Sequence, residues 1–178
     1  MMSDGELAAA LRAAAYLEGD FTLRSGRKSR YYLDKYLFET EPRLLKELAI
    51  RFARFVTPQI HRLAGAELGG IPLAAAAALE TGRPFVIVRN SKKLDYGTGK
   101  LIEGRLSAGD RVLLVEDIAT SGGQSIEAMK SLAAAGAIVD RVVVVIDRGE
   151  GARSAVEAAG FAFEALFTSA DLGIAKSG

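Results

Sequence analysis

Residues 112–125 read VLLVEDIATSGGQS, and this stretch decides the fold. Its apolar opening, Val112–Val115, predicts a buried strand, which we expect to end in two carboxylates, Glu116 and Asp117. A short turn rich in hydroxyl groups and glycines follows, and a helix is expected to begin near Gly123. Glycines let backbone N–H groups approach an anion closely, and a helix N-terminus adds about half a positive charge at the same place. The stretch therefore predicts a strand, a phosphate-binding loop and a helix in succession.

The side chains around this loop suit a phosphorylated sugar. Thr120 and Ser121 can donate hydroxyl groups to phosphate oxygens, and the two carboxylates suit ribose hydroxyls or the shell of a Mg²⁺ ion. The loop is not a Walker motif, because no Gly-Lys-Ser/Thr closes it, and it is not the G-x-G-x-x-G dinucleotide motif. The alternative is an ordinary strand-to-helix junction in which Gly122-Gly123 serves only as a turn.

Length and composition predict one domain with a sizeable core. The chain has 178 residues, of which 49% are hydrophobic. Its formal net charge is only +1, so it lacks the general positive field that drives nucleic-acid binding. It contains no cysteine, which excludes disulfides and thiolate chemistry. The N-terminus has no basic segment, and no apolar run reaches the roughly 20 residues that span a bilayer, so we expect a cytoplasmic protein without membrane contact.

Apolar periodicity alternates between strand-like and helix-like segments along the chain. Ser3 and Glu6 form a capping box ahead of a first helix that Gly19 is expected to stop, and Ser25-Gly26 predicts the turn of a hairpin within residues 21–34. Further helices are predicted at 42–52, 72–79, 124–135 and 152–159, and strands at 63–66, 84–88, 112–115, 142–146 and 161–167. This alternation predicts an α/β fold with a doubly wound, mainly parallel sheet and helices on both faces. Ligands are then expected at the carboxyl ends of the strands.

Three further loops at these strand ends carry polar groups. Residues 67–72 could bring backbone N–H groups to a diphosphate, or form a plain turn. Residues 89–104 form a polar loop rich in cations and glycines, which is either a solvated loop or a lid over a site. Arg148 follows the strand at 142–146, where a guanidinium can bind a carboxylate with two parallel bonds or simply pair with Asp147 or Glu150.

Residues 112–125 resemble the motif for 5-phosphoribosyl-1-diphosphate (PRPP) of the type I phosphoribosyltransferases. Taken with the other segments, the chain resembles the orotate phosphoribosyltransferase family from about residue 5 to 172. Residues 21–34 look like the hood of that family, residues 67–72 like its diphosphate-side loop, and residues 96–104 like the end of its catalytic loop. Asp147-Arg148 matches the strand end whose arginine contacts orotate.

The resemblance implies a single phosphoribosyltransferase domain over residues 1–178, with residues 1–40 forming the N-terminal helix and hood. It implies transfer of the phosphoribosyl group from PRPP to orotate, giving orotidine 5′-monophosphate and diphosphate in pyrimidine biosynthesis. Mg²⁺ is the implied cofactor, and it binds through PRPP and not directly to protein side chains. A homodimer is also implied, in which the 89–104 loop reaches the site of the neighbouring subunit.

The resemblance also assigns site residues. Lys92, Lys93, Glu116 and Asp117 are the implied catalytic residues. PRPP is expected to contact Arg89, Lys92, Lys93, Tyr96, Glu116, Asp117, Ile118, Ala119, Thr120, Ser121, Gly122, Gly123 and Gln124. Orotate is expected to contact Thr120, Arg148, Tyr32 and Leu33, with the backbone from Tyr31 to Leu33 taking part.

The loop departs from the family pattern. Asn90 follows Arg89 where the family has lysine, the span to Gly97 is one residue longer, and Tyr96 takes a position that is usually histidine or an aromatic residue. Both Lys92 and Lys93 therefore remain candidates for the catalytic-loop lysine. The single histidine, His61, precedes a strand and is expected at the surface.

Three other functions fit part of the sequence. A phosphoribosyltransferase for a purine or uracil would share residues 112–125 but not the hood. A PRPP-sensing regulator without catalysis would need a helix-turn-helix or a basic face, against which the near-neutral charge argues. A nucleotide-binding module without transferase activity is the third alternative.

Overall fold

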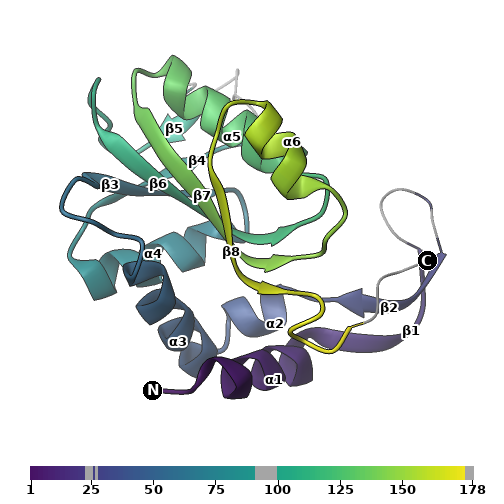
Figure 1. Ribbon diagram of the computed structural model, residues 1–178. Helices are drawn as coiled ribbons and strands as arrows, with labels where there is room; N and C mark the ends of the chain where they lie inside the picture. The colour runs from purple at the N-terminus through teal and green to yellow at the C-terminus, as the bar shows by residue number, and fades with distance from the viewer. Residues whose placement is uncertain (23–25, 27, 91–99, 175–178) are drawn as a thin grey trace.

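A six-stranded sheet forms the centre of the computed structural model, which describes residues 1–22, 26, 28–90 and 100–174. The strand order is β5-β4-β3-β6-β7-β8, and every neighbouring pair is parallel except β4 and β5. The strands are β3 (Arg62–Ala66), β4 (Phe85–Val88), β5 (Ile102–Glu103), β6 (Arg111–Ala119), β7 (Ile138–Asp147) and β8 (Phe163–Thr168). The sheet confirms the doubly wound, mainly parallel α/β fold (Figure 1).

Helices cover both faces of this sheet (Figure 1). They are α1 (Asp4–Ala15), α2 (Tyr36–Glu39), α3 (Pro42–Ala53), α4 (Gly70–Thr81), α5 (Gly123–Ala134) and α6 (Ala152–Ala158). Successive side chains of β6 point to opposite faces and so join two separate cores. Leu113 and Val115 pack in one core with residues of α1, α3 and α4, while Val112 and Leu114 pack in the other with residues of α5 and α6. None of the helices in the described ranges is long and apolar enough to cross a membrane.

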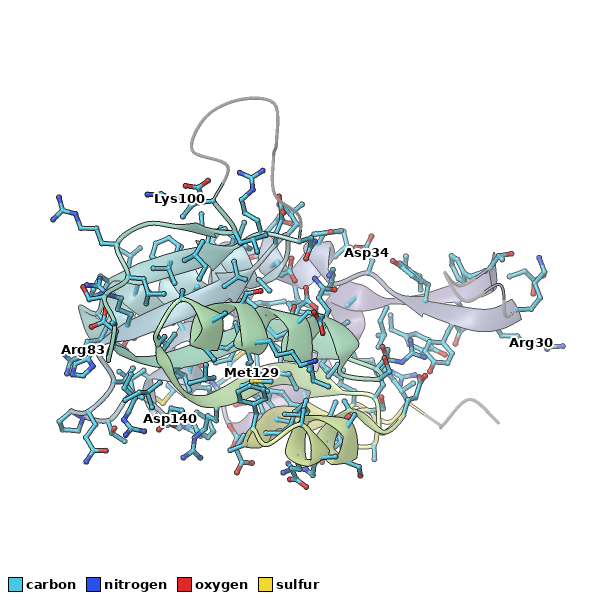
Figure 2. All side chains as sticks on the ribbon, turned by 90° about the horizontal axis from the view of Figure 1, so that it is seen from above. Arg30, Asp34, Arg83, Lys100, Met129 and Asp140 are labelled. Carbon is cyan, nitrogen blue, oxygen red and sulfur yellow. The ribbon has the colours of Figure 1, made fainter. Side chains whose placement is uncertain are left out.

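The hood is an antiparallel pair of strands, β1 (Tyr16–Thr22) and β2 (Lys28–Leu33), separate from the main sheet. Seen from above, it extends away from the sheet, with Arg30 toward its far end and Asp34 where it rejoins the body (Figure 2). The prediction that the first helix runs to Gly19 is wrong, because α1 ends at Ala15 and Gly19 lies within β1. Tyr16 pairs with Leu33 and its ring stacks on that of Tyr31, so strand pairing replaces the last expected turn of helix.

Three other features differ from the prediction. β6 continues four residues past Val115, so Glu116 and Asp117 lie within the strand and not beyond its end. The extension follows from β7, which reaches Asp147 and pairs with β6 up to Ala119. Residues 102–103, expected in a loop, form β5 against the end of β4. The four-residue helix α2 was also not predicted, because a single turn leaves no periodic signal.

Candidate active site

The loop between β6 and α5 has the geometry of an anion-binding site. Gly122 has φ +78°, a left-handed conformation that glycine adopts without strain. The N-cap residue of α5 is Gly122, which has no side chain to cap the helix, so the first N–H groups of this helix are available to an anion. A pocket of about 290 Å³ lies over them, lined by Glu116 and residues 118–125. Thr120 and Ser121 are exposed at this loop. The sequence-predicted phosphate loop is therefore a concave pocket at a helix N-terminus.

β6 also positions the two acids next to this loop. Glu116 and Asp117 are 3% and 2% exposed. Asp117 accepts a bond from Lys35 Nζ on Oδ2 at 2.6 Å, and its Oδ1 accepts a bond from the backbone N–H of Ile118. Glu116 Oε2 accepts a hydrogen bond from the Ser125 hydroxyl at 3.5 Å. The structure thus buries both predicted acids in β6, with Glu116 directed toward α5 and Asp117 toward Lys35.

A third carboxyl group, which the sequence did not reveal, lies against Asp117. Glu39 is 2% exposed, and neither of its carboxyl oxygens accepts a hydrogen bond from a described residue, so its close polar neighbour is the Asp117 carboxylate. Gly69 packs against both acids, since a Cβ atom there would overlap Asp117 Oδ2 and Glu39 Oε1. The diphosphate-side loop, residues 67–72, therefore lies directly on the acidic cluster, and a residue without a side chain is required at position 69.

Burial sets the charges of this cluster. Loss of solvent raises the pKa of Glu39 to about 8, and the nearby charge of Asp117 adds to the effect. Burial likewise raises the pKa of Glu116 to about 8, again with a contribution from Asp117. Burial lowers the pKa of Lys35, but the attraction and hydrogen bond of Asp117 outweigh it, so the net pKa of Lys35 is raised. At pH 7 the ammonium is charged, whereas Glu39 and Glu116 favour their protonated forms.

Two loops and the first turn of α5 meet at one backbone atom. The carbonyl oxygen of Glu67 accepts hydrogen bonds from Asn90 Nδ2 at 3.0 Å and from Gln124 Nε2 at 2.8 Å. The backbone N–H of Asn90 donates to Glu67 Oε2 at 3.0 Å. A pocket of about 470 Å³ opens beside this junction, lined by the ends of β3 and β4 and by α5. Asn90, which departs from the family pattern, therefore joins the diphosphate-side loop to the end of β4.

The cationic loop is described only in part. Arg89 lies at the end of β4, with its Nη1 3.5 Å from Glu103 Oε1 on β5. Its Nε atom is buried without a hydrogen-bond partner among the described residues. Lys92, Lys93 and Tyr96 fall in residues 91–99, outside the described residues. Their predicted contacts with PRPP stay predictions.

On the other side of the site, Arg148 faces the hood. Its Nη2 donates to the Tyr31 hydroxyl at 3.1 Å, and its Nε lies 2.9 Å from Glu150 Oε1. The neighbouring hood residues point elsewhere: the Tyr32 ring packs on Phe21, 5.6 Å between centroids, and Leu33 is buried in the core. The structure therefore brings Arg148 next to the side chain of Tyr31. A contact between orotate and the backbone of Tyr32 and Leu33 stays a prediction.

Lys35 and Glu39 are the site residues that sequence reasoning missed, whereas Gly69 lies in the predicted diphosphate-side loop. Lys35 and Glu39 are four residues apart, a spacing that places two side chains on one helical face. That spacing is the only local signal, because Lys35 reaches its partner Asp117 across a separation of 82 residues in the sequence. His61 is exposed, as expected, and its Nδ1 accepts a bond from the backbone N–H of Arg111.

A phosphate loop and two acids at the end of a central parallel strand define the class of phosphoribosyltransferases. A family model described as the phosphoribosyl transferase domain matches residues 58–165. Over 172 residues the chain is 49% identical to the orotate phosphoribosyltransferase of Natronomonas pharaonis, covering 96% of this chain and 98% of its relative. Over 170 residues it is 45% identical to the orotate phosphoribosyltransferase of Methanocella arvoryzae, covering 95% and 97%.

Solved structures agree. The orotate phosphoribosyltransferase of Mycobacterium tuberculosis superposes with a TM-score of 0.85 at 33% identity, covering 96% of this chain and 99% of that one. The same enzyme in complex with PRPP gives a TM-score of 0.78 at 32% identity, with the same coverage. The chain belongs to the orotate phosphoribosyltransferase family, which confirms the resemblance of its sequence.

Proposed function

We infer that this chain transfers the 5-phosphoribosyl group from PRPP to orotate, forming orotidine 5′-monophosphate and diphosphate. The observation that carries this inference is 45–49% identity to curated orotate phosphoribosyltransferases over nearly the whole chain. The hood and Arg148 support orotate as the base, because they offer a guanidinium and a phenol at the position where a carboxylate-bearing ring would lie.

We propose that the phosphoribosyl half of PRPP binds along β6 and its loop. The 5′-phosphate would accept bonds from the backbone and hydroxyl groups of residues 118–124. The ribose hydroxyls would donate to Glu116 and Asp117. Breaking the bond between C1′ and diphosphate builds positive charge on the sugar, and a negative carboxylate beneath the ribose stabilises that charge. Orotate N1 then forms the new bond to C1′ and gives up its proton, which the leaving diphosphate can accept.

The leaving diphosphate needs cations. We propose that Arg89, Lys92, Lys93 and Tyr96 contact it, with either lysine acting as the catalytic-loop residue. The expected homodimer would let this loop serve the neighbouring subunit's site.

Orotate would contact Arg148, Thr120 and the backbone of Tyr32 and Leu33. We also keep the predictions that residues 1–178 form one domain and that the protein is cytoplasmic.

Mg²⁺ is the proposed cofactor, held through the oxygens of PRPP. The donor set fits this arrangement, because the two acids of β6 already have hydrogen-bond partners in the protein. Lys35 and Ser125 already occupy oxygens of Asp117 and Glu116. When bound, the ion would neutralise part of the charge that develops on diphosphate.

Incubation with PRPP, Mg²⁺ and one base at a time tests this function. We expect orotate to be consumed in preference to uracil, adenine or hypoxanthine by at least ~10³ in kcat/KM, since a site built around a charged group rejects bases that leave it unpaired. Reactions containing EDTA serve as the control for the metal. Equal use of uracil would contradict the proposal, and turnover of a purine alone would replace it with a purine phosphoribosyltransferase.

A further inference from the structure

Lys35 is the one cation in the described residues that contacts the acidic cluster of Glu39, Glu116 and Asp117. Its Nζ lies 2.6 Å from Asp117 Oδ2, and its side chain is 26% exposed, whereas that of Asp117 is 3% exposed. Lys35 lies between the hood strand β2 and helix α2. Its ammonium group therefore reaches the base of the site from the end of the hood. An ion pair therefore links the hood segment to the ribose end of β6.

Glu39 and Asp117 lie against each other and cannot both be ionised without a large cost, and Glu116 adds a third buried acid on the opposite face of β6. Removing a carboxylate from water is costly unless a partner is present, and like charges in contact favour uptake of a proton. Asp117 has the ammonium and a backbone N–H as partners. Glu116 has only a long contact with the Ser125 hydroxyl, and Glu39 has no hydrogen bond from any described residue. The contacts thus favour negative charge on Asp117 and protons on its two neighbours.

We propose that Lys35 is a positioning residue that keeps the negative charge of the cluster on Asp117, the carboxylate beneath the ribose. The proposal rests on the inferred transferase function and concerns the charge that stabilises the sugar during transfer. PRPP then meets a preformed anion held in one orientation. Without the ammonium, a proton would be shared among the three acids, and the site would lose its charge at a higher pH than in the wild type.

Other groups around Lys35 do not take over this role. Tyr36 places its ring centroid 5.4 Å from Nζ, and Asp34 accepts a bond from the backbone N–H of Tyr36. From α2 the facing acid is Glu39, from β6 the facing acid is Asp117, and the diphosphate-side loop contributes the backbone of Gly69. Glu116, on the other face of β6, interacts with Lys35 only electrostatically. The surroundings of Lys35 are therefore acidic or neutral, and its charge is not duplicated by the groups that the structure describes there.

The pH dependence of kcat/KM for PRPP, at saturating orotate, tests this role. In Lys35→Met the fall in kcat/KM on acidification should begin at a pH at least ~1 unit higher than in the wild type. Near neutrality this shift corresponds to a kcat/KM about tenfold below that of the wild type. The deficit should shrink above about pH 9, where the carboxyl groups are ionised in both proteins. Lys35→Arg should keep the wild-type profile. Lys130→Met, which removes an exposed pair with Glu127 at 3.2 Å, is the matched control.

A second variant and a second measurement distinguish an effect of Lys35 on the charge of the acids from a general effect on the stability of the fold. Adding Glu39→Gln to Lys35→Met should move the acid limb of the kcat/KM profile back toward that of the wild type, because one carboxyl group that shares the negative charge with Asp117 is gone. Calorimetry of PRPP binding without orotate, in two buffers of different ionisation heat, should show more protons released by Lys35→Met than by the wild type near pH 7.

The outcomes distinguish the two claims. If the wild-type protein binds PRPP but converts no orotate at any pH, the proposed transferase function is wrong. The role of Lys35 is then tested by the calorimetric measurement of PRPP binding alone. If Lys35→Met matches Lys130→Met in both its pH profile and its proton release, the role of Lys35 is wrong. An acid limb displaced as far in Lys35→Arg as in Lys35→Met would also overturn it.

Discussion

Asp117 combines deep burial with a charged partner, and that combination decides what its substitution should do. Its side chain lies in contact with Lys35 and Glu39, at the two ends of α2, and with Gly69 in the diphosphate-side loop. A buried carboxylate crowded by another acid contributes little to the free energy of unfolding, even when it is paired, because desolvation offsets the attraction. The same carboxylate is well placed to stabilise positive charge on a sugar.

Asp117→Asn should therefore separate catalysis from folding. The amide keeps the shape of the side chain but removes the charge beneath the ribose, so we expect turnover of orotate to fall by roughly 10²-fold or more. The melting temperature should stay within a few degrees of the wild type. Steady-state kinetics and calorimetry on the same preparation measure both, and loss of the folded state would mean that Asp117 is mainly structural.

Glu39 should make stability depend on pH in the opposite sense to a surface acid. Its pKa is raised by burial from 4.5 to about 8, so the folded state holds a proton that the unfolded state releases between these values. Stability that Glu39 contributes below pH 4.5 is lost as the pH rises toward 8, with Glu116 acting in the same direction.

Glu39→Gln removes one of these two acids. Between about pH 5.5 and 8.5 its melting temperature should rise relative to the wild type by ~3 °C or more. Glu127→Gln, at an exposed position on α5, should show a constant difference over the same range. A difference for Glu39→Gln that does not change with pH would show that Glu39 is ionised in the folded protein.

Local patterns predicted the acids on β6 but not the residues that surround them. Glu116 and Asp117 follow an apolar run, so their place at the site could be derived from the chain itself. Lys35 and Glu39 belong to a four-residue helix and its N-terminal cap, and their closeness to Asp117 exists only after the hood has folded onto the sheet. Gly69 is identifiable as a small residue, but the reason for its size is the overlap with carboxyl oxygens contributed by two other segments.

Among the elements, the turn into α5 depends on its contact with α6. A Cβ atom on Gly122 would lie 3.1 Å from the carbonyl oxygen of Ala152 and 3.2 Å from Val156 Cγ2. The phosphate loop is thus held between its own helix and the start of the next one. Its left-handed backbone, φ +78°, leaves no relaxed position for a side chain.

Gly122→Ala should impair binding of PRPP as well as stability. We expect a stability loss of ~1 kcal/mol or more from the left-handed backbone, and a rise in the KM for PRPP of about tenfold from displacement of the loop. Gly160→Ala is the matched control, since Gly160 has φ +87° but a Cβ atom added there would meet no other atom within 4 Å. It should lose similar stability with an unchanged KM. Equal KM values for the two variants would contradict the expected coupling to α6.

Most elements were predictable, but β5 and α2 were not. Pro42 marks the start of α3, and the β-branched run of β7 lies in the interior of the sheet, as expected for strands buried on both faces. β5 and α2 have two and four residues, which is too few to show a period. The end of α1 was misplaced because Tyr16 joins a strand whose partner lies at the far side of a hairpin.

For the whole molecule, the proposed homodimer makes a quantitative prediction. One protein would carry Ala at Arg89, Lys92 and Lys93, and the other would carry Asp117→Asn; both homodimers should be nearly inactive. If each site takes its loop from one subunit and its acids from the other, mixing with subunit exchange restores one good site per heterodimer. Random exchange makes about half of the dimers heterodimers, so roughly a quarter of wild-type activity should return.

Exchange must be measured independently, for example by mass spectrometry of subunits that carry different tags. Mixing two samples of the same variant controls for activity regained without complementation. Activity that fails to return after exchange has been demonstrated would mean that the 89–104 loop serves its own subunit's site or none.

The separation of the hood from the main sheet has a consequence for how such a protein can change. β1 and β2 share no strand pairing with the six-stranded sheet in the described part of the chain, and they approach the site through a few side chains such as Tyr31. The loop that we assign to the sugar phosphate belongs to β6 and α5 instead. Selection or laboratory evolution could therefore change the base specificity through substitutions in the hairpin, without altering the segments that we assign to the phosphoribosyl group.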